Sequence, residues 1–237
     1  MNVLEIDDQE EVTATQLQDA ARDEMAIQCT LQKAVMIVRE HLSVRETNVT
    51  FLLTDSWTAR PECHHVTELL ITEKIGEARM GRIMERIHPV AHKTGAHSDV
   101  FYAYMRQLSF SMSCFGHIKR IHGMRTEREV EGYDHMLSTI RFENGAMAQV
   151  EISSTKGLKP IYEIDISGTQ GNVHYRNEPT ASFQIEMEDD TSTQVDPKEV
   201  STETADLQRI TFMELFQLMK LTEQAFQSAT TGLSQEV

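Results

Sequence analysis

The chain has 237 residues, of which 40% are hydrophobic and 25% charged, and its formal net charge is −15. This composition is typical of a globular protein with a substantial core, so it excludes wholesale disorder. The 37 acidic residues outnumber the 22 basic ones, which excludes a surface that tracks nucleic-acid phosphates. Because no stretch approaches about 18 apolar residues without a charge, we expect no membrane span.

The negative charge is concentrated in two segments. Residues 1–24 carry eight acidic residues and one basic residue, and residues 186–206 carry the same numbers. Runs of like charge are usually solvated. We therefore expect residues 1–23 to be poorly ordered and the acidic segment after Met187 to form a loop or flap.

The cysteines and the first residues indicate a compartment. Cys29, Cys63 and Cys114 are odd in number and far apart in the sequence, which is typical of free thiols in a reducing environment. The opening letters MNVLEIDDQEEV contain no apolar signal segment, so they do not resemble a secretory leader. Together these features predict a cytoplasmic protein.

The first part of the chain predicts short helices and strands in alternation. Apolar residues recur at helical spacing over 24–42, a short β-prone run covers 48–53, and a helix is expected over 61–74. Gly76 is suited to end that helix. A strand over 77–88, a loop over 89–98 and a helix over 99–114 follow.

From residue 117 the hydrophobic period changes to two. Strands are expected over 117–124 and 134–143, and Asn144-Gly145 is a strong signal for a hairpin turn. Further short strands follow up to residue 187, and a last helix is expected to start near Ala205. Ile140, Phe142, Val150 and Ile152 alternate with Arg141, Glu143, Gln149 and Glu151, so one face of the sheet needs a cover of helices. We expect an α+β fold with a large, mostly antiparallel open sheet and helices on one face.

Several stretches resemble one known family. Residues 73–78 (EKIGEA), 133–151 (YDHMLSTIRFENGAMAQVE), 162–173 (YEIDISGTQGNV) and 223–232 (EQAFQSATTG) resemble motifs of the Gfo/Idh/MocA oxidoreductases. The motifs occur in the family's order, and the match runs from about residue 24 to the end. The chain is identified as a member of this family that lacks part of its N-terminal domain.

The resemblance implies a fold and an activity for complete members. These are NAD(P)-dependent dehydrogenases of sugars, inositols or related polyols, with an N-terminal Rossmann domain and a C-terminal sheet domain. A Gly-rich turn holds the dinucleotide diphosphate, and a Lys in an E-K-P motif and a later His assist hydride transfer. By this resemblance, residues 1–60 are an incomplete Rossmann remnant and residues 61–237 are the sheet domain.

The chain departs from the family at each functional position. Its first glycine is Gly76, so no Gly-rich turn precedes that residue. Alignment places Asp23 where the lysine belongs, and Arg106 and Ser109 where the histidine and a following aspartate belong. We therefore predict no catalytic, cofactor-binding or metal-binding residues in this chain, and no cofactor for this chain alone.

Two functions remain open at this stage. The first is a non-catalytic protein that binds a small ligand or acts as an accessory subunit, with self-association through the open sheet face. The alternative is a dehydrogenase subunit whose Rossmann half comes from another chain or is missing from the gene model. Partners would then be a second copy or a Rossmann-containing subunit, with no nucleic acid and no membrane.

Two smaller features admit other interpretations. A metal site could be formed by the histidines His88, His92 and His97, with Cys63, His64 and His65 elsewhere. Their spacing matches no established ligand pattern. We interpret them as polar residues of a loop or as remnants of a polyol pocket. A metal-dependent hydrolase is a third, weaker alternative for the function.

Trp57 and Arg60 follow the strand over 48–53, and we interpret Trp57 as a cover for the next helix.

Overall fold

The computed structural model describes residues 3–42, 48–88, 98–128, 133–177, 183–187, 192–195 and 207–237. The chain divides into two compact units. Unit 1 comprises residues 1–60 and 204–220, and unit 2 comprises residues 61–203 and 221–237. The division falls after Arg60, where the sequence analysis ends its first segment, but residues 204–220 join unit 1 instead of the sheet domain.

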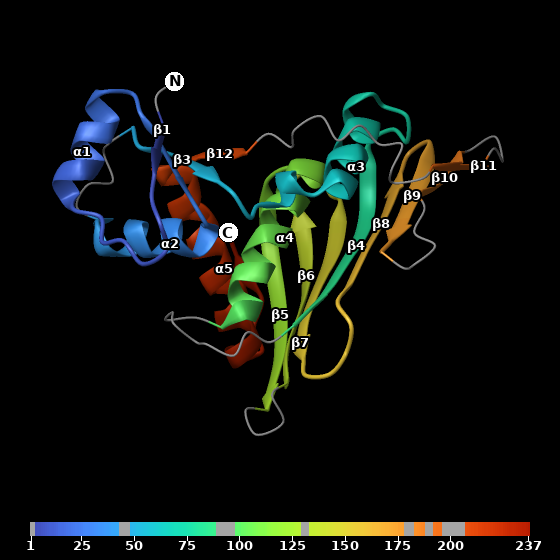
Figure 1. Cartoon of the computed structure of the whole chain (residues 1–237). Coiled ribbons are helices and arrows are strands. Elements are labelled where there is room, and N and C mark those ends of the chain that lie inside the picture. The colour runs from blue at the N-terminus through green and yellow to red at the C-terminus, as the bar shows by residue number, and fades with distance from the viewer. Residues whose placement is uncertain are drawn as a thin grey trace. The chain divides into compact units, whose positions relative to one another are not determined.

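Unit 1 is a small parallel sheet with helices and one antiparallel edge strand (Figure 1). The strand order is β1-β2-β3-β12, in which β1, β2 and β3 run parallel and β12 runs antiparallel to β3. Its elements are β1 (Val3–Glu5), α1 (Ala14–Arg22), β2 (Ala26–Cys29), α2 (Leu31–Glu40), β3 (Thr50–Leu53), the 3-10 turn η2 (Trp57–Ala59) and β12 (Gln208–Thr211). Each helix connects two parallel strands, as in a βαβ unit.

Burial explains why these short strands form. All four residues of β3 are buried, as expected for a parallel strand that is covered on both faces. Phe212, the first residue of helix α5 (Phe212–Thr231), donates its N–H to the carbonyl of Val49 at 2.9 Å, and its ring lies 6.4 Å from that of Phe51. The start of α5 is therefore part of the unit 1 core.

Two expectations for this unit were wrong. The predicted helix over 24–42 is a strand, Ala26–Cys29, followed by a shorter helix, Leu31–Glu40. The last helix begins at Phe212 and not near Ala205, because β12 precedes it. In both cases a short apolar run fits either period, and pairing with neighbouring strands decides the outcome.

The acidic N-terminal segment contains a helix with a complete capping box. Thr13 Oγ1 accepts from the Gln16 N–H at 3.2 Å, and Gln16 Oε1 accepts from the Thr13 N–H at 2.8 Å. Leu17 and Ala20 are buried. The structure thus gives a strand and a helix where the charge pattern predicted poor order, and the degree of order there stays a prediction.

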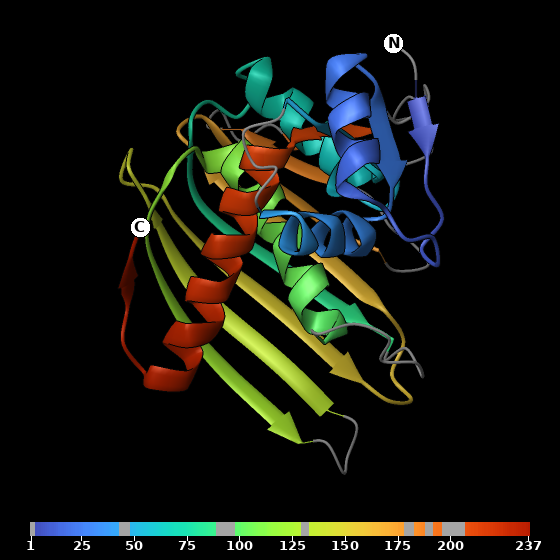
Figure 2. The same ribbon diagram turned by 90° about the vertical axis from the view of Figure 1, so that its left-hand side faces the viewer.

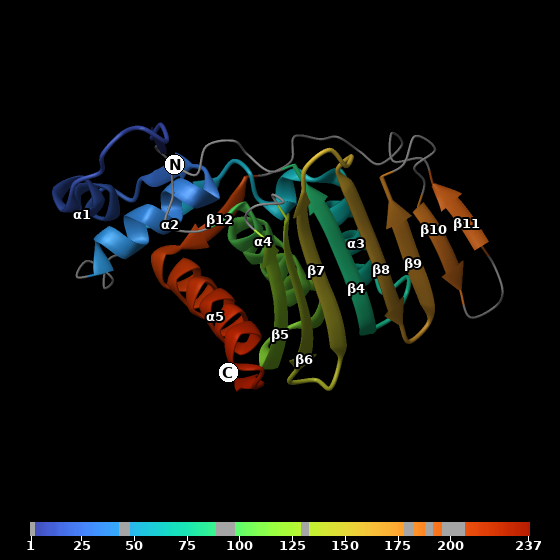
Figure 3. The ribbon, with the colours of Figure 1, turned by 90° about the horizontal axis from the view of Figure 1, so that it is seen from below.

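Unit 2 contains a nine-stranded sheet of order β11-β10-β9-β8-β4-β7-β6-β5-β13 (Figure 3). All neighbours are antiparallel except the parallel pair β4 and β7. The elements are α3 (Pro61–Ile71), β4 (Ala78–Ile87), α4 (Asp99–Phe115), β5 (Ile118–Arg128), β6 (Tyr133–Phe142), β7 (Met147–Thr155), β8 (Ile161–Gly168), β9 (Gly171–Arg176), β10 (Phe183–Met187), β11 (Ser192–Val195) and β13 (Gln235–Glu236). The expected large, mostly antiparallel sheet is confirmed.

The two faces of this sheet differ, as the alternating pattern predicts. Ile140, Phe142, Val150 and Ile152 are fully buried, on the face that α4 covers (Figure 2). We call the opposite face, which carries Arg141 and Gln149, the outer face. The alternation therefore sets which face the helices cover.

The second half of α5 lies directly on β5. A Cβ atom on Gly123 would come within 2.3 Å of the Ala225 carbonyl oxygen, so only glycine permits this approach. Ser228 Oγ accepts from the Gly123 N–H at 2.9 Å and donates to the Leu233 carbonyl at 2.6 Å. Among the described helices, none is long and apolar enough to cross a membrane.

We predict that Thr13→Ala lowers the free energy of unfolding of unit 1 by about 1 kcal/mol, because it removes the side-chain acceptor at the start of α1. Thr13→Ser keeps the acceptor and should cost much less. Urea unfolding, with hydrogen exchange of residues 14–22, measures both effects. If α1 is poorly ordered in solution, Thr13→Ala will change neither measurement.

Candidate functional site

The carboxyl ends of β1, β2 and β3 lie at one edge of the unit 1 sheet, because the three strands are parallel. In open parallel sheets, ligands bind beyond this edge. The residues that follow the strands here are Asp8 after β1, Thr30 after β2 and Asp55 after β3. This edge is therefore the first place to test for a dinucleotide site.

The chain's own side chains close the start of α2 at this edge. Thr30 is the N-cap; its hydroxyl accepts from the Lys33 N–H at 3.2 Å and donates to Asp8 Oδ1 at 2.7 Å. Asp55 Oδ1 accepts from the Leu31 N–H at 2.6 Å. The helix terminus that would attract an external anion already has an internal carboxylate.

Lys33, in the first turn of α2, is more than nine-tenths buried. Its ammonium donates to the carbonyl oxygen of Glu10 and lies 3.5 Å from that of Asp8. These contacts tie the loop after β1 to α2. Lys33 was not among the predicted site residues, because the helix predicted over 24–42 begins too early and hides that this lysine is close to the strand ends.

The thiol of Cys29, at the end of β2, stays protonated at neutral pH. Burial first, and then the carboxylates of Asp55 and Asp8, raise its pKa to about 12 against the lowering effect of Lys33. A thiol in this state is a poor nucleophile. Cys29 is therefore a core residue of this edge.

These residues do not fit a dinucleotide diphosphate. A diphosphate needs backbone N–H groups that it can approach closely, which glycine normally provides, and the first glycine of the chain is Gly76. Asp8 and Asp55 would repel its negative charge, and Lys33 is directed to backbone carbonyls. The polar side chains at this edge bind the chain's own loops to one another and to α2.

The alignment of Asp23 with the family lysine was wrong. Asp23 is the C-cap of α1, where its N–H donates to the Asp19 carbonyl, whereas the residue that precedes α2 is Thr30. The error arose because residues 26–29 form a strand. Under the resemblance, the strand-to-helix junction that corresponds to the E-K-P motif is therefore Cys29-Thr30. This junction contains no lysine.

Arg106 and Ser109, which the sequence analysis matched with the family histidine and aspartate, lie in unit 2 on α4. Both are partly exposed. No histidine occurs in α4. That these two positions correspond to the family's catalytic ones stays a prediction.

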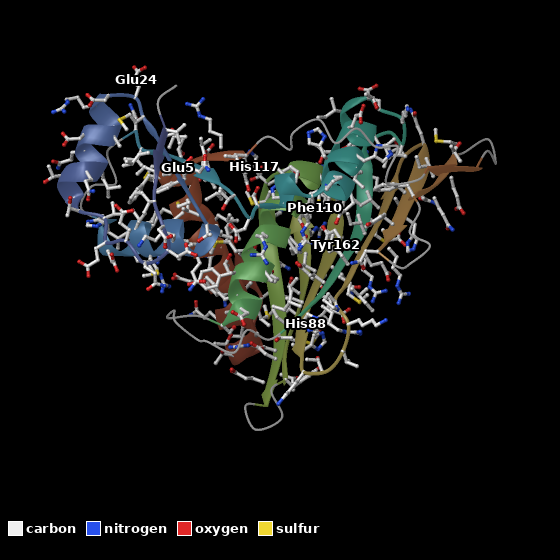
Figure 4. All side chains as sticks on the ribbon, in the orientation of Figure 1. Glu5, Glu24, His88, Phe110, His117 and Tyr162 are labelled. Carbon is white, nitrogen blue, oxygen red and sulfur yellow. The ribbon has the colours of Figure 1, made fainter. Side chains whose placement is uncertain are left out.

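A buried polar chain connects α3, α4 and the sheet in unit 2. Tyr162 Oη donates to Gln107 Oε1 at 3.0 Å, and Gln107 Nε2 donates to Glu85 Oε2 at 2.7 Å. The Cys63 thiol lies 3.0 Å from Tyr162 Oη, and all four side chains are buried; Tyr162 is labelled in Figure 4. Buried hydrogen-bonded groups of this kind fix the position of a helix on a sheet. No local sequence signal predicts this network, because its members are 22 to 99 positions apart.

The remaining candidates do not come together. His88 is exposed at the end of β4, and His92 and His97 lie outside the described residues. Within the described ranges, no group of three His, Cys, Asp or Glu side chains is arranged to hold a metal ion. Trp57 is buried in η2, which packs near β12.

The outer face of the unit 2 sheet contains a shallow hollow of about 430 Å³, whose lining includes Met80, Met147, Thr139 and Ser167. Met80 and Met147 are paired neighbours on β4 and β7 and are 57% and 44% exposed. Beside them, Arg82 lies 3.3 Å from Glu151 and 3.7 Å from Glu163. The face thus combines exposed thioethers with ion pairs, a composition suited to contact with another protein surface.

We predict that Asp55→Ala lowers the free energy of unfolding of unit 1 by about 1 kcal/mol, since it removes the acceptor at the first N–H of α2. Asp55→Asn retains an acceptor oxygen and should lose less. Thermal unfolding followed by circular dichroism compares the two variants. Equal losses in both would show that the charge of Asp55, and not its hydrogen bond, matters.

Comparison with known proteins was made by family model, by sequence and by structure. No family model and no curated protein matches the chain. The solved structures similar to it include an oxidoreductase from Agrobacterium radiobacter in complex with NAD+, L-tartaric acid and magnesium (TM-score 0.66, 16% identity, 94% of this chain and 76% of that one). They also include an inositol dehydrogenase homologue from Azotobacter vinelandii complexed with NADH and myo-inositol (0.66, 13%, 94% and 74%), and the apo form of levoglucosan dehydrogenase (0.71, 12%, 100% and 80%).

At these identities the likeness establishes the fold and no more. It extends over nearly the whole chain, including both units, and the similar structures are oxidoreductases and dehydrogenases. The chain therefore has the fold of oxidoreductases of the Gfo/Idh/MocA type.

Proposed function

We propose that this chain is a Gfo/Idh/MocA-family protein that does not transfer hydride by itself and acts as a ligand-binding or accessory subunit. The proposal rests on one observation, which is that the chain's own side chains occupy the carboxyl edge of the unit 1 sheet. We call this the closed edge. Asp55 and Thr30 occupy the start of α2, and Asp8 is held by Thr30. A cofactor diphosphate would have to displace these contacts and approach two carboxylates.

The outer face of the nine-stranded sheet supports an accessory role. Helices cover the opposite face, and the outer face presents Met80 and Met147 beside the ion pairs of Arg82. Two copies that met through this face would bury the thioethers and could exchange ion pairs between Arg82 and Glu151 or Glu163. An interface of this kind is isologous, with the same surface on both partners.

A second candidate is a dehydrogenase subunit that obtains its dinucleotide-binding half from another chain. The position of β1 favours it, because β1 lies at one edge of the unit 1 sheet among the described strands, and an edge strand can pair with a strand of another protein. Under this proposal the reaction would need both chains. Mass spectrometry of the complex isolated from source cells would identify a partner with a Gly-rich strand-turn-helix.

We predict that the purified chain binds neither NADH nor NADPH with a Kd below about 1 mM. The expected physical cause is charge repulsion at the closed edge and the lack of glycine backbone there. A fluorescence titration of each cofactor measures this, with a complete dehydrogenase of the same fold as the positive control. Saturable binding at micromolar concentration by the chain alone would overturn the proposal.

We predict that Met147→Asp weakens self-association at least 100-fold, because it places an unpaired carboxylate in the contact. Met213→Asp, at a methionine of similar exposure (41%) on α5, is the matched control and should leave association unchanged. Light scattering during size-exclusion chromatography would detect conversion to the 27.0 kDa monomer. A wild-type chain that is monomeric at 50 μM or so would contradict the accessory role through this face.

A further inference from the structure

His65 is a mostly buried imidazole on α3 that faces the outer strands of the nine-stranded sheet. Its ring lies 4.6 Å from the ring of Phe183 on β10, edge to face, and Phe183 stacks on Tyr175 of β9 at 4.7 Å. Only 14% of the His65 side chain is exposed. The imidazole is therefore part of the packed contact between α3 and this edge of the sheet.

The two ring nitrogens of His65 have unequal surroundings. Nδ1 lies 3.8 Å from Glu68 Oε2, one turn further along α3. Nε2 is buried, and no hydrogen-bond partner for it exists among the described residues. A neutral imidazole can leave Nε2 without a proton, but an imidazolium donates from both nitrogens. Protonation would thus create a buried N–H without an acceptor, which is costly.

The charged groups that act on His65 come from α3 and the residues after it. Burial lowers the pKa of His65, Lys74 lowers it as well, and Glu68 opposes them and raises it. Among the described residues of β9 and β10, the side chains that share the face of Phe183 are apolar or aromatic: Val173 and Tyr175 on β9, and Ile185 on β10. Glu68 is itself 64% exposed, so solvent screens its support for the protonated ring.

We propose that protonation of His65 breaks its contact with Phe183 and releases β10, with its paired strands β9 and β11, so that this end of the sheet opens in mild acid. The end of the sheet formed by β9, β10 and β11 binds fewer protons when it is packed than when it is released. Its packed state is therefore most stable above the ordinary histidine pKa near 6.5 and loses stability as the pH drops below that value.

Hydrogen exchange tests this proposal on the full chain at pH 7.5 and pH 5.0, with each rate divided by the intrinsic rate at that pH. We expect protection of residues 171–187 to fall severalfold at pH 5.0, while residues 147–152 of β7 keep theirs. Loss of protection throughout the sheet, or none in residues 171–187, would overturn the proposal.

His65→Phe is the decisive variant, because phenylalanine retains an aromatic contact with Phe183 but cannot take up a proton. Its protection over residues 171–187 should be the same at both pH values. The matched control, His64→Phe, changes an exposed histidine on the same helix and should keep the wild-type pH dependence. An unchanged pH dependence in His65→Phe would show that another group opens the edge.

A measurement on the wild-type chain covers the case in which His65→Phe does not fold. Nuclear magnetic resonance can follow the His65 ring and the β10 amides through the same pH titration. We expect both to change with one midpoint below the ordinary histidine value. Ring protonation that leaves the β10 amide shifts unchanged would contradict the proposal.

Discussion

The alternation of side chains between the two faces of the strands is the constraint on which unit 2 depends. It places Ile140, Phe142, Val150 and Ile152 on one face and polar residues on the other. The burial of that apolar face is the dominant favourable term, and it requires α4 and the second half of α5 as a cover. The polar chain from Glu85 through Gln107 to Tyr162 then selects one position of α4 among those that would bury a similar area.

Buried polar groups in unit 1 also need hydrogen-bond partners. They find them at the carboxyl edge of the sheet. Thr30, Asp8 and Asp55 satisfy one another and the first N–H groups of α2, and Lys33 satisfies carbonyls of the preceding loop. The edge that serves for ligands in open parallel sheets is used here for cohesion. This is why the fold of a dehydrogenase does not by itself carry the activity of one to this chain.

Several of the described surfaces are suited to contact with another protein. The outer face has exposed methionines and ion pairs, whereas β1 and β11 are edge strands of their sheets. Around His65 the aromatic packing of β9 and β10 leaves Nε2 with no hydrogen-bond partner among the described residues, which in our proposal makes that edge sensitive to protonation. Under the proposed function, such surfaces are the places where ligands, partners or pH can act.

The sequence alone determined the sheet of unit 2, because period-two alternation and the Asn144-Gly145 turn are local signals that tertiary contacts reinforce. The sequence also shows that the first glycine is Gly76. Only the tertiary structure decided that Ala26–Cys29 is a strand, that β12 joins unit 1, and that Asp55 lies on the first N–H of α2, 24 positions away. A four-residue apolar run has no period long enough to distinguish strand from helix, and a contact between distant residues leaves no local trace, so these features arise only when the chain is folded.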